Sequence, residues 1–243
     1  MKFAAFPKFL LLAGLAGTLT LTGCGFTSSS HSGSAPTAGN WSFVAASTVT
    51  SGQVSHVGGN LTVSGNNVSS TMHSDLPCFD PSLPFTFSGT LQNKQITFTS
   101  PANANNQVIT VIAAVTSSSA ITGTYTVTAG GGCAADQGSV TAALVPSLSG
   151  TWTGPINGGQ GGNSVTLSMA LRQASTASTD GTFALTGNLT YTNSSCSKSG
   201  TVNNSYLAGS MIVMQATTLE QDGITQASIS YNNAFLNLSL IHI

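Results

Sequence analysis

Charged residues are scarce in this sequence. Of its 243 residues, only 5 are Lys or Arg and 6 are Asp or Glu. Beyond position 8 the basic residues are Lys94, Arg172 and Lys198, which lie far apart in the chain. Nucleic acids and other polyanions are bound by clusters of Lys and Arg. The composition therefore argues against a nucleic-acid partner.

The apolar segment near the start is too short for a transmembrane helix. Phe9–Leu15 follows the basic residues Lys2 and Lys8, whereas a spanning helix needs about 20 apolar residues. This order, with small residues next, is typical of a signal peptide. The residues Leu21-Thr22-Gly23-Cys24 resemble, at all four positions, the lipobox of bacterial lipoproteins. The alternative is an ordinary secretory signal with a chance cysteine.

The resemblance to bacterial lipoproteins implies an exported protein that is anchored to a membrane. Cys24 would carry diacylglycerol and an N-terminal acyl chain, and residues 1–23 would be removed. More than one lipid chain is generally required for stable anchoring. Residues 24–38, rich in Ser and Gly, would form a flexible tether. Gly25, where an aspartate would favour inner-membrane retention, favours the outer membrane or cell surface over the cell membrane.

The rest of the sequence has the pattern of an all-β protein. Hydrophobic residues make up 40% of the chain, enough for a packed core despite the low charge. Apolar and Thr- or Ser-rich positions alternate in Phe85–Leu91, Ile121–Val127, Val165–Leu171 and Phe183–Tyr191. Alternation with a period of two residues predicts antiparallel sheet with one buried face. No helical pattern follows the signal, and Met211–Met214 is interpreted as a buried strand.

Similar segments recur 111 residues apart. Gly39–Ser42 and Gly150–Thr153 each place a tryptophan two residues after a glycine, and Ser88–Leu91 recurs as Ser199–Val202. A third pair, Gly59-Asn60-Leu61-Thr62 and Gly187-Asn188-Leu189-Thr190, has a different offset. Two copies of one β-unit explain these matches economically.

The repeat divides the mature chain into two antiparallel β-meander units, 39–146 and 147–237. Each is long enough for about six to eight short strands, the size of a small barrel or sandwich. The Gly-x-Trp opening followed by a meander resembles lipocalin-like domains of bacterial lipoproteins. Immunoglobulin-like sandwiches are the alternative. They rank second because Trp41 precedes both cysteines of its unit instead of lying between them.

The cysteines and the end of the chain fit an incomplete second unit. Cys78 and Cys133 lie in the first unit and are expected to form a disulfide in an oxidising compartment. Shifting Cys133 by the 111 residues of the repeat leads to position 244, so we expect the partner of Cys196 beyond Ile243. Cys196 could instead pair with another molecule or with either earlier cysteine. Residues 238–243 match a translated library adapter, and the natural protein is expected to continue past Asn237; a genuine closing strand is the alternative.

One cluster of potentially reactive side chains occurs in the first unit, namely His73, Asp75, Cys78 and Asp80. It lacks the recurring spacing of metal sites, and the second unit has no His or carboxylate at the corresponding place. We therefore expect no catalytic residues, no metal and no cofactor. His56, and also His31 and His242 near the two ends, are not expected to have a specific role.

These features predict a non-enzymatic lipoprotein of the cell envelope. It would bind a small apolar molecule inside a barrel or present an outer face to a protein partner. A structural or adhesive envelope component is the alternative. A hydrolase is the third hypothesis, for which His73 is the candidate residue.

Overall fold

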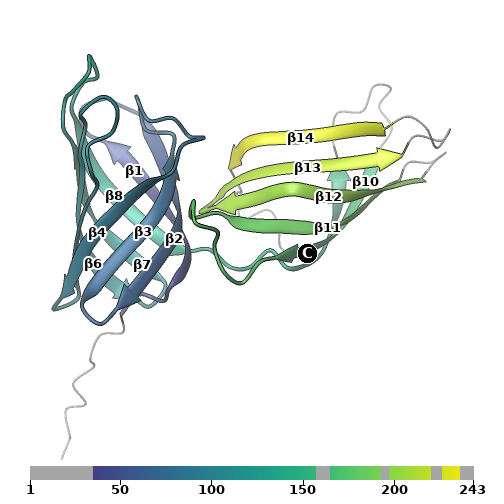
Figure 1. The fold of residues 1–243 in the computed structure, drawn as a ribbon, viewed down its shortest axis with the longest axis horizontal. Helices are drawn as coiled ribbons and strands as arrows, with labels where there is room; N and C mark the ends of the chain where they lie inside the picture. The colour runs from purple at the N-terminus through teal and green to yellow at the C-terminus, as the bar shows by residue number, and fades with distance from the viewer. Residues whose placement is uncertain (1–34, 157–164, 193–196, 220–225, 236–243) are drawn as a thin grey trace, which may run out of the picture. The chain divides into compact units, whose positions relative to one another are not determined.

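A closed β-barrel forms the first half of the chain (Figure 1). The computed structural model describes residues 35–156, 165–192, 197–219 and 226–235. The barrel strands are β1 (Gly39–Ser47), β2 (Val54–Ser64), β3 (Asn67–Ser74), β4 (Phe85–Gln92), β5 (Gln95–Thr99), β6 (Ile109–Ser117), β7 (Ala120–Val127) and β8 (Asp136–Leu144). Each strand pairs antiparallel with the next along the chain, and β1 pairs with β8 to close the barrel.

The barrel interior is apolar because alternate side chains of each strand point inward. In β6, for example, Ile109, Val111, Ala113 and Val115 are buried, while the residues between them are more exposed. Trp41 is fully buried. The outer positions carry mainly Thr and Ser, as the period-two pattern predicted.

Short turns and long loops lie at opposite ends of the barrel. The turns β2–β3, β4–β5 and β6–β7 each use two residues, and Asn93 and Lys94 have the positive φ angles (50° and 65°) that suit tight hairpins. The connections 75–84, 100–108 and 128–135 are longer and gather at the other end. We call these two ends the turn end and the loop end.

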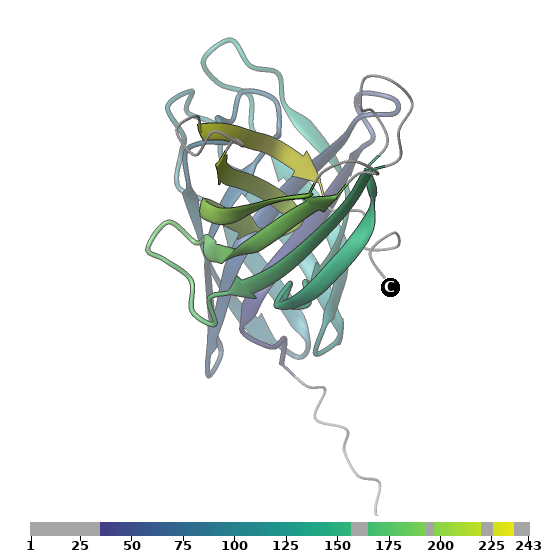
Figure 2. The same ribbon diagram turned by 90° about the vertical axis from the view of Figure 1, so that its right-hand side faces the viewer.

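The second half of the chain forms a six-stranded antiparallel sheet. Its strands are β9 (Gly150–Ile156), β10 (Val165–Gln173), β11 (Phe183–Thr192), β12 (Ser197–Ala208), β13 (Met211–Leu219) and β14 (Gln226–Phe235). They pair in chain order, from β9 in teal to β14 in yellow, and the sheet is curled (Figure 2). Among the described residues, β9 pairs only with β10 and β14 only with β13. Within the described ranges, therefore, this sheet has two open edges, unlike the barrel.

Side-chain and backbone contacts join the sheet to β1 of the barrel. The side-chain amide of Asn40 donates to the carbonyl oxygen of Gly209 at 3.0 Å, and its Oδ1 accepts the N–H of Gly209 at 2.7 Å. Ser42 Oγ and Ser210 Oγ are 2.9 Å apart. Gly58 and Gly209 lie so close that a Cβ at Gly209 would be 2.5 Å from Gly58 Cα. The absence of both side chains permits this backbone contact.

The prediction of an all-β fold is confirmed. The described ranges contain strands and no helix, and hence no helix that is long and apolar enough to cross a membrane. Met211–Met214 lies in strand β13, as predicted; Met211 and Ile212 are buried, whereas Val213 and Met214 are only half-buried. The first unit is a closed barrel, whereas the sequence pattern alone allowed either a barrel or an immunoglobulin-like sandwich. The matched segments Gly59–Thr62 and Gly187–Thr190 lie on the second strand of the barrel and the third strand of the open sheet, so they are not structural equivalents.

Candidate binding site in the barrel

The four reactive side chains singled out in the sequence do not form one site. The ring nitrogens of His73 face two backbone carbonyl oxygens, Nδ1 at 2.9 Å from that of Pro81 and Nε2 at 3.1 Å from that of Asp180. Asp75 instead lies beside His56, with Oδ2 at 3.2 Å from Nδ1. The His73 imidazole and the Asp75 carboxylate thus have separate partners and do not contact each other through these bonds.

Asp80 and Cys78 have structural roles. Asp80 Oδ1 accepts hydrogen bonds from the backbone and hydroxyl of Ser82, which hold the pKa of this exposed carboxyl below its ordinary value. Cys78 forms a disulfide with Cys133, in agreement with the expected pairing. Within the described ranges, no group of three or more His, Cys, Asp or Glu is arranged to hold a metal ion. Cys24, Cys196, His31 and His242 lie outside those ranges.

A small cavity lies inside the barrel, in the half nearer the loop end. About 20 Å³ of it is open to a water-sized molecule, which is room for about one water. Its lining is drawn from all eight strands and is apolar except for one serine and one tyrosine: Phe43, Ala45, Val57, Ser70, Met72, Leu76, Phe87, Phe98, Ile109, Val111, Tyr125 and Val140.

Ser70 is the exceptional residue of this lining. It is 5% exposed, and among the described residues its Oγ is the one buried side-chain oxygen or nitrogen without a hydrogen-bond partner. The Tyr125 hydroxyl, by contrast, donates to Asp136 Oδ2 at 2.7 Å. A buried hydroxyl without a partner costs about 1 to 3 kcal/mol. The cavity therefore contains one unused hydrogen-bonding group in apolar surroundings.

Tyr125 and Asp136 close one side of the loop end. Burial is the main cause that raises the pKa of the Tyr125 phenol, and the hydrogen bond to Asp136 adds to it. Ser47 also donates to Asp136, through Oδ1 at 2.5 Å. These groups satisfy one another and leave the Ser70 hydroxyl as the available polar atom of the cavity.

Aromatic rings line the way from the loop end into the core. Phe79 of the β3–β4 loop contacts Phe85, with ring centroids 5.5 Å apart, and Phe85 contacts Phe87 at 5.2 Å. Phe87 in turn contacts Phe98 at 5.8 Å. Phe87 and Phe98 line the cavity, so the row of rings connects the loop with the interior.

The β3–β4 loop covers the cavity. Of the lining residues, Leu76 alone comes from a loop, and it is 3% exposed. Its N–H donates to Ser74 Oγ, and its carbonyl oxygen accepts the N–H of Phe79. We refer to Leu76–Phe79 as the cap segment. Cys78 lies within it, and the disulfide to Cys133 ties the cap segment to the β7–β8 loop.

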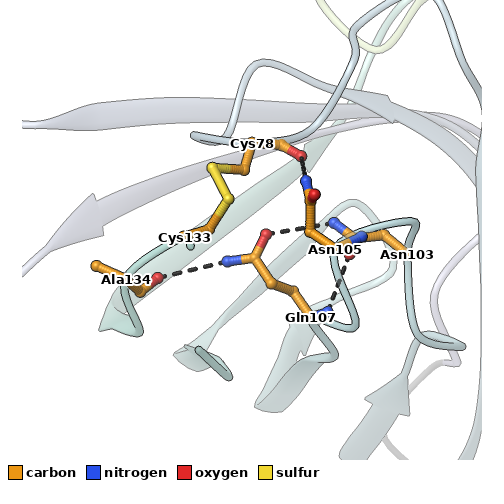
Figure 3. Close-up of a disulfide and its surroundings, with 6 residues drawn as sticks. All are labelled: Cys78, Asn103, Asn105, Gln107, Cys133 and Ala134. Atoms are coloured by element: carbon orange, nitrogen blue, oxygen red, sulfur yellow. Dashed lines mark hydrogen bonds between the residues drawn. A yellow bond between two sulfur atoms is a disulfide. The ribbon is translucent and has the colours of Figure 1, made fainter. Parts of the chain in front are cut away.

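The third long loop reinforces this arrangement (Figure 3). Asn105 Nδ2 donates to the carbonyl oxygen of Cys78 at 3.2 Å, and Gln107 Nε2 donates to that of Ala134 at 3.4 Å. Gln107 is 1% exposed, and its N–H donates to Asn103 Oδ1. The β5–β6 loop thus bonds to the residues on both sides of the disulfide.

Sequence reasoning missed Ser70, although a signal for it exists. Val68, Ser70 and Met72 occupy alternate positions of β3, and the two apolar neighbours are buried. The same alternation therefore places the serine on the inner face. Whether an inward serine finds a partner depends on the strands across the barrel, which local sequence does not specify.

The features that bear on function are the apolar lining, the unpartnered hydroxyl of Ser70 and the cap segment with its disulfide. They are properties of this chain's own geometry. No protein-family model, no curated protein and no solved structure matches the chain.

Proposed function

We propose that this protein is a lipid-anchored, non-enzymatic binding protein of the bacterial cell envelope, and that its barrel binds a small apolar molecule. The lipobox-like Leu21–Cys24 supports the anchor. The Cys78–Cys133 disulfide fits an oxidising compartment outside the cytoplasm. Residues 24–38 would separate the barrel from a lipid on Cys24.

The observation that carries the binding function is the unpartnered Ser70 hydroxyl in an apolar cavity inside the barrel. Ligand sites are mostly apolar, with a few polar groups that fix the orientation of the ligand. Ser70 would supply such a group, while the surrounding Phe, Val, Ile and Met side chains would supply the apolar contact. A core evolved for stability alone has no use for a buried hydroxyl without a partner, since a methyl group would avoid its cost.

The volume of the cavity sets a condition on this function. About 20 Å³ admits water but no organic ligand. A ligand must therefore displace a side chain, and Leu76 is the lining residue that is not held in a strand.

The anchor is tested by labelling cells with a radioactive fatty acid and comparing the wild type with Cys24→Ala. We expect label in the wild type alone. Label in both proteins would contradict lipidation at Cys24. For the binding function, the mature chain with Cys24→Ser is purified without detergent and extracted with solvent, and the extract is analysed by mass spectrometry. Ser70→Val, which fills the cavity, is the control and should retain no ligand; an equal or absent signal in both would contradict the proposal.

A structural or adhesive role is the second candidate, and the outer face of the barrel favours it. Exposed threonines face one another across strands, in the pairs Thr90 with Thr97 and Thr122 with Thr141. Such an uncharged, hydrogen-bonding wall suits contact with other envelope components. Protease treatment of intact cells should remove the protein if it acts at the surface. Full protection from the protease would contradict this role.

We further propose that the open sheet and the barrel arose as two copies of one β-unit. Gly39 and Gly150 both have positive φ angles (148° and 143°), and each precedes a tryptophan by two residues. The matched segments Ser88–Leu91 and Ser199–Val202 fall on the fourth strand of their sheets. Eight strands close the barrel, whereas the second sheet has six and two open edges among the described residues.

A further inference from the structure

We infer that the ligand of the barrel is a neutral molecule with a narrow apolar body and one hydrogen-bonding group, and that this group binds the Ser70 hydroxyl. The ligand enters at the loop end as the Leu76 side chain moves aside. This inference rests on the proposed binding function and specifies the ligand class and the route.

Neutrality follows from the lining of the cavity. No Lys, Arg, Asp, Glu or His is among its residues, and burying an unpaired charge in such surroundings costs far more than one hydrogen bond returns. Asp136 lies beside the cavity and already accepts from Tyr125 and Ser47. A carboxylate ligand would also be repelled by this negative charge. Alcohols, aldehydes, ketones and esters remain as the fitting classes.

That the ligand has a single hydrogen-bonding group follows from the chemistry of Ser70. A serine hydroxyl can donate one hydrogen bond and accept others, so it can pair with either a hydroxyl or a carbonyl oxygen. The other lining side chains offer no unpartnered polar atom, since the only other polar one, Tyr125, donates to Asp136. A second polar group on the ligand would therefore be buried without a partner.

The route follows from the two ends of the barrel. At the turn end, Trp41 and Leu61 are fully buried, and neither lines the cavity. Two-residue turns leave little backbone that could move there. At the loop end, one loop residue, Leu76, completes the enclosure. Moving the Leu76 side chain therefore opens the cavity without breaking any strand pairing or the Cys78–Cys133 disulfide.

The test uses the mature chain with Cys24→Ser, so that no attached lipid competes, and with ¹³C-labelled methionine methyl groups. Met72 lines the cavity, whereas Met169 and Met214 lie in the second sheet and serve as internal controls. The probes are 1-hexanol, n-hexane and hexanoate at neutral pH. We expect 1-hexanol to shift the Met72 methyl resonance and to leave those of the two control methionines unchanged.

Ser70→Ala should weaken 1-hexanol binding about three- to tenfold, the value of one hydrogen bond, and leave hexane binding unchanged. Ser69→Ala, the same change on the exposed neighbour, should affect neither probe. Leu76→Ala should speed binding and release of both. Hexanoate should leave Met72 unshifted.

The outcomes separate the inference from the function on which it rests. If 1-hexanol binds the wild type and Ser70→Ala equally well, the role of Ser70 is wrong but the binding function stands. If hexanoate binds as tightly as 1-hexanol, the neutrality of the ligand is wrong. If neither 1-hexanol nor hexane shifts Met72 in the wild type or in Leu76→Ala, the binding function itself is wrong, and a trapped water is the partner of Ser70.

Discussion

The Tyr125 hydroxyl donates a hydrogen bond to Asp136 Oδ2 at 2.7 Å across the β7–β8 pair. Burial of the phenol, and then this contact with a negative carboxylate, raise the pKa of Tyr125 above its ordinary value of 10.0. The folded protein therefore keeps the phenol protonated at pH values where the unfolded chain begins to lose the proton. The stabilisation is complete below about pH 10 and is lost as the pH rises through and above that value.

Tyr125→Phe should remove this alkaline loss. We expect the free energy of unfolding of the wild type to fall more steeply above pH 10 than that of the variant, relative to each protein's value at pH 7. Urea unfolding followed by circular dichroism between pH 7 and pH 11 measures both curves. Parallel curves would show that Tyr125 ionises alike in the folded and unfolded chains.

Removing the disulfide should destabilise the barrel and loosen the cap segment. Cys78 and Cys133 are 55 residues apart, and closing a loop of this length stabilises by about 4 kcal/mol on the chain-entropy estimate. The Cys78→Ser, Cys133→Ser variant should therefore lose up to that amount in thermal or urea unfolding. The wild type treated with a dithiol reductant is the matched control and should behave like the variant.

Hydrogen exchange locates the effect of the missing disulfide. The amide of Phe79, which donates to the carbonyl oxygen of Leu76, should exchange faster in the variant than in the wild type. The amide of Val115, at the turn end near Lys94, should exchange faster only to the extent that global stability falls. Equal acceleration at both amides would show that the disulfide does not act locally on the cap segment.

The sequence predicted the strands because their signal is local. Alternation in Phe85–Leu91 and in Ile121–Val127 determines which side chains face inward, and Phe87, Ile121 and Tyr125 are indeed buried. Closure of the barrel is different, because it depends on β1 pairing with β8, where Trp41 lies opposite Leu144. Barrel and sandwich have the same period-two pattern, so that pattern could not distinguish them.

The candidate site was predicted less well for a related reason. His73 and Asp75 looked reactive because their types are common in catalysis, but their partners are a carbonyl of Asp180, distant in sequence, and His56 on the neighbouring strand. Ser70 went unnoticed because serine is common in this chain. Its significance arises only from the lack of a partner in the folded barrel.

Asn40 should contribute strongly to the contact with Gly209. Its side chain satisfies both the N–H and the carbonyl group of Gly209, and Asn40 is 3% exposed. Asn40→Ala would leave these backbone groups without that partner, at a cost of about 1 to 3 kcal/mol for a buried group. Unfolding by urea measures the loss. A change within experimental error would indicate that water replaces the asparagine.

Gly209→Ala tests the close backbone contact separately. Gly209 has φ +62°, and an added Cβ would lie 2.5 Å from Gly58 Cα and 2.8 Å from the carbonyl oxygen of Trp41. Gly52 is the matched control, with φ +77° and nothing within 4 Å of its added Cβ. Both substitutions bear the cost of a left-handed alanine, about 1 kcal/mol. Gly209→Ala should cost clearly more than Gly52→Ala, and equal costs would contradict a tight contact at Gly58.

Trp41 and Trp152 occupy corresponding places at the start of the two β-units. Each indole N–H donates at 2.8 Å to the carbonyl oxygen of the residue four positions earlier, Thr37 or Leu148. Trp41 is fully buried, because β1 is flanked by β2 and β8, whereas Trp152 on the open-edged β9 is half-buried. The two tryptophans therefore make the same contact in different degrees of enclosure.

Trp41→Phe should cost more free energy of unfolding than Trp152→Phe. Both changes remove an indole hydrogen bond, worth about 0.5 to 1.5 kcal/mol. The first also leaves a cavity where a fully buried ring stood, whereas the second changes a half-buried ring, so its cavity cost is smaller. Hydrogen exchange resolved along the chain assigns each loss to the barrel or to the open sheet. Equal costs would contradict the tighter enclosure of Trp41.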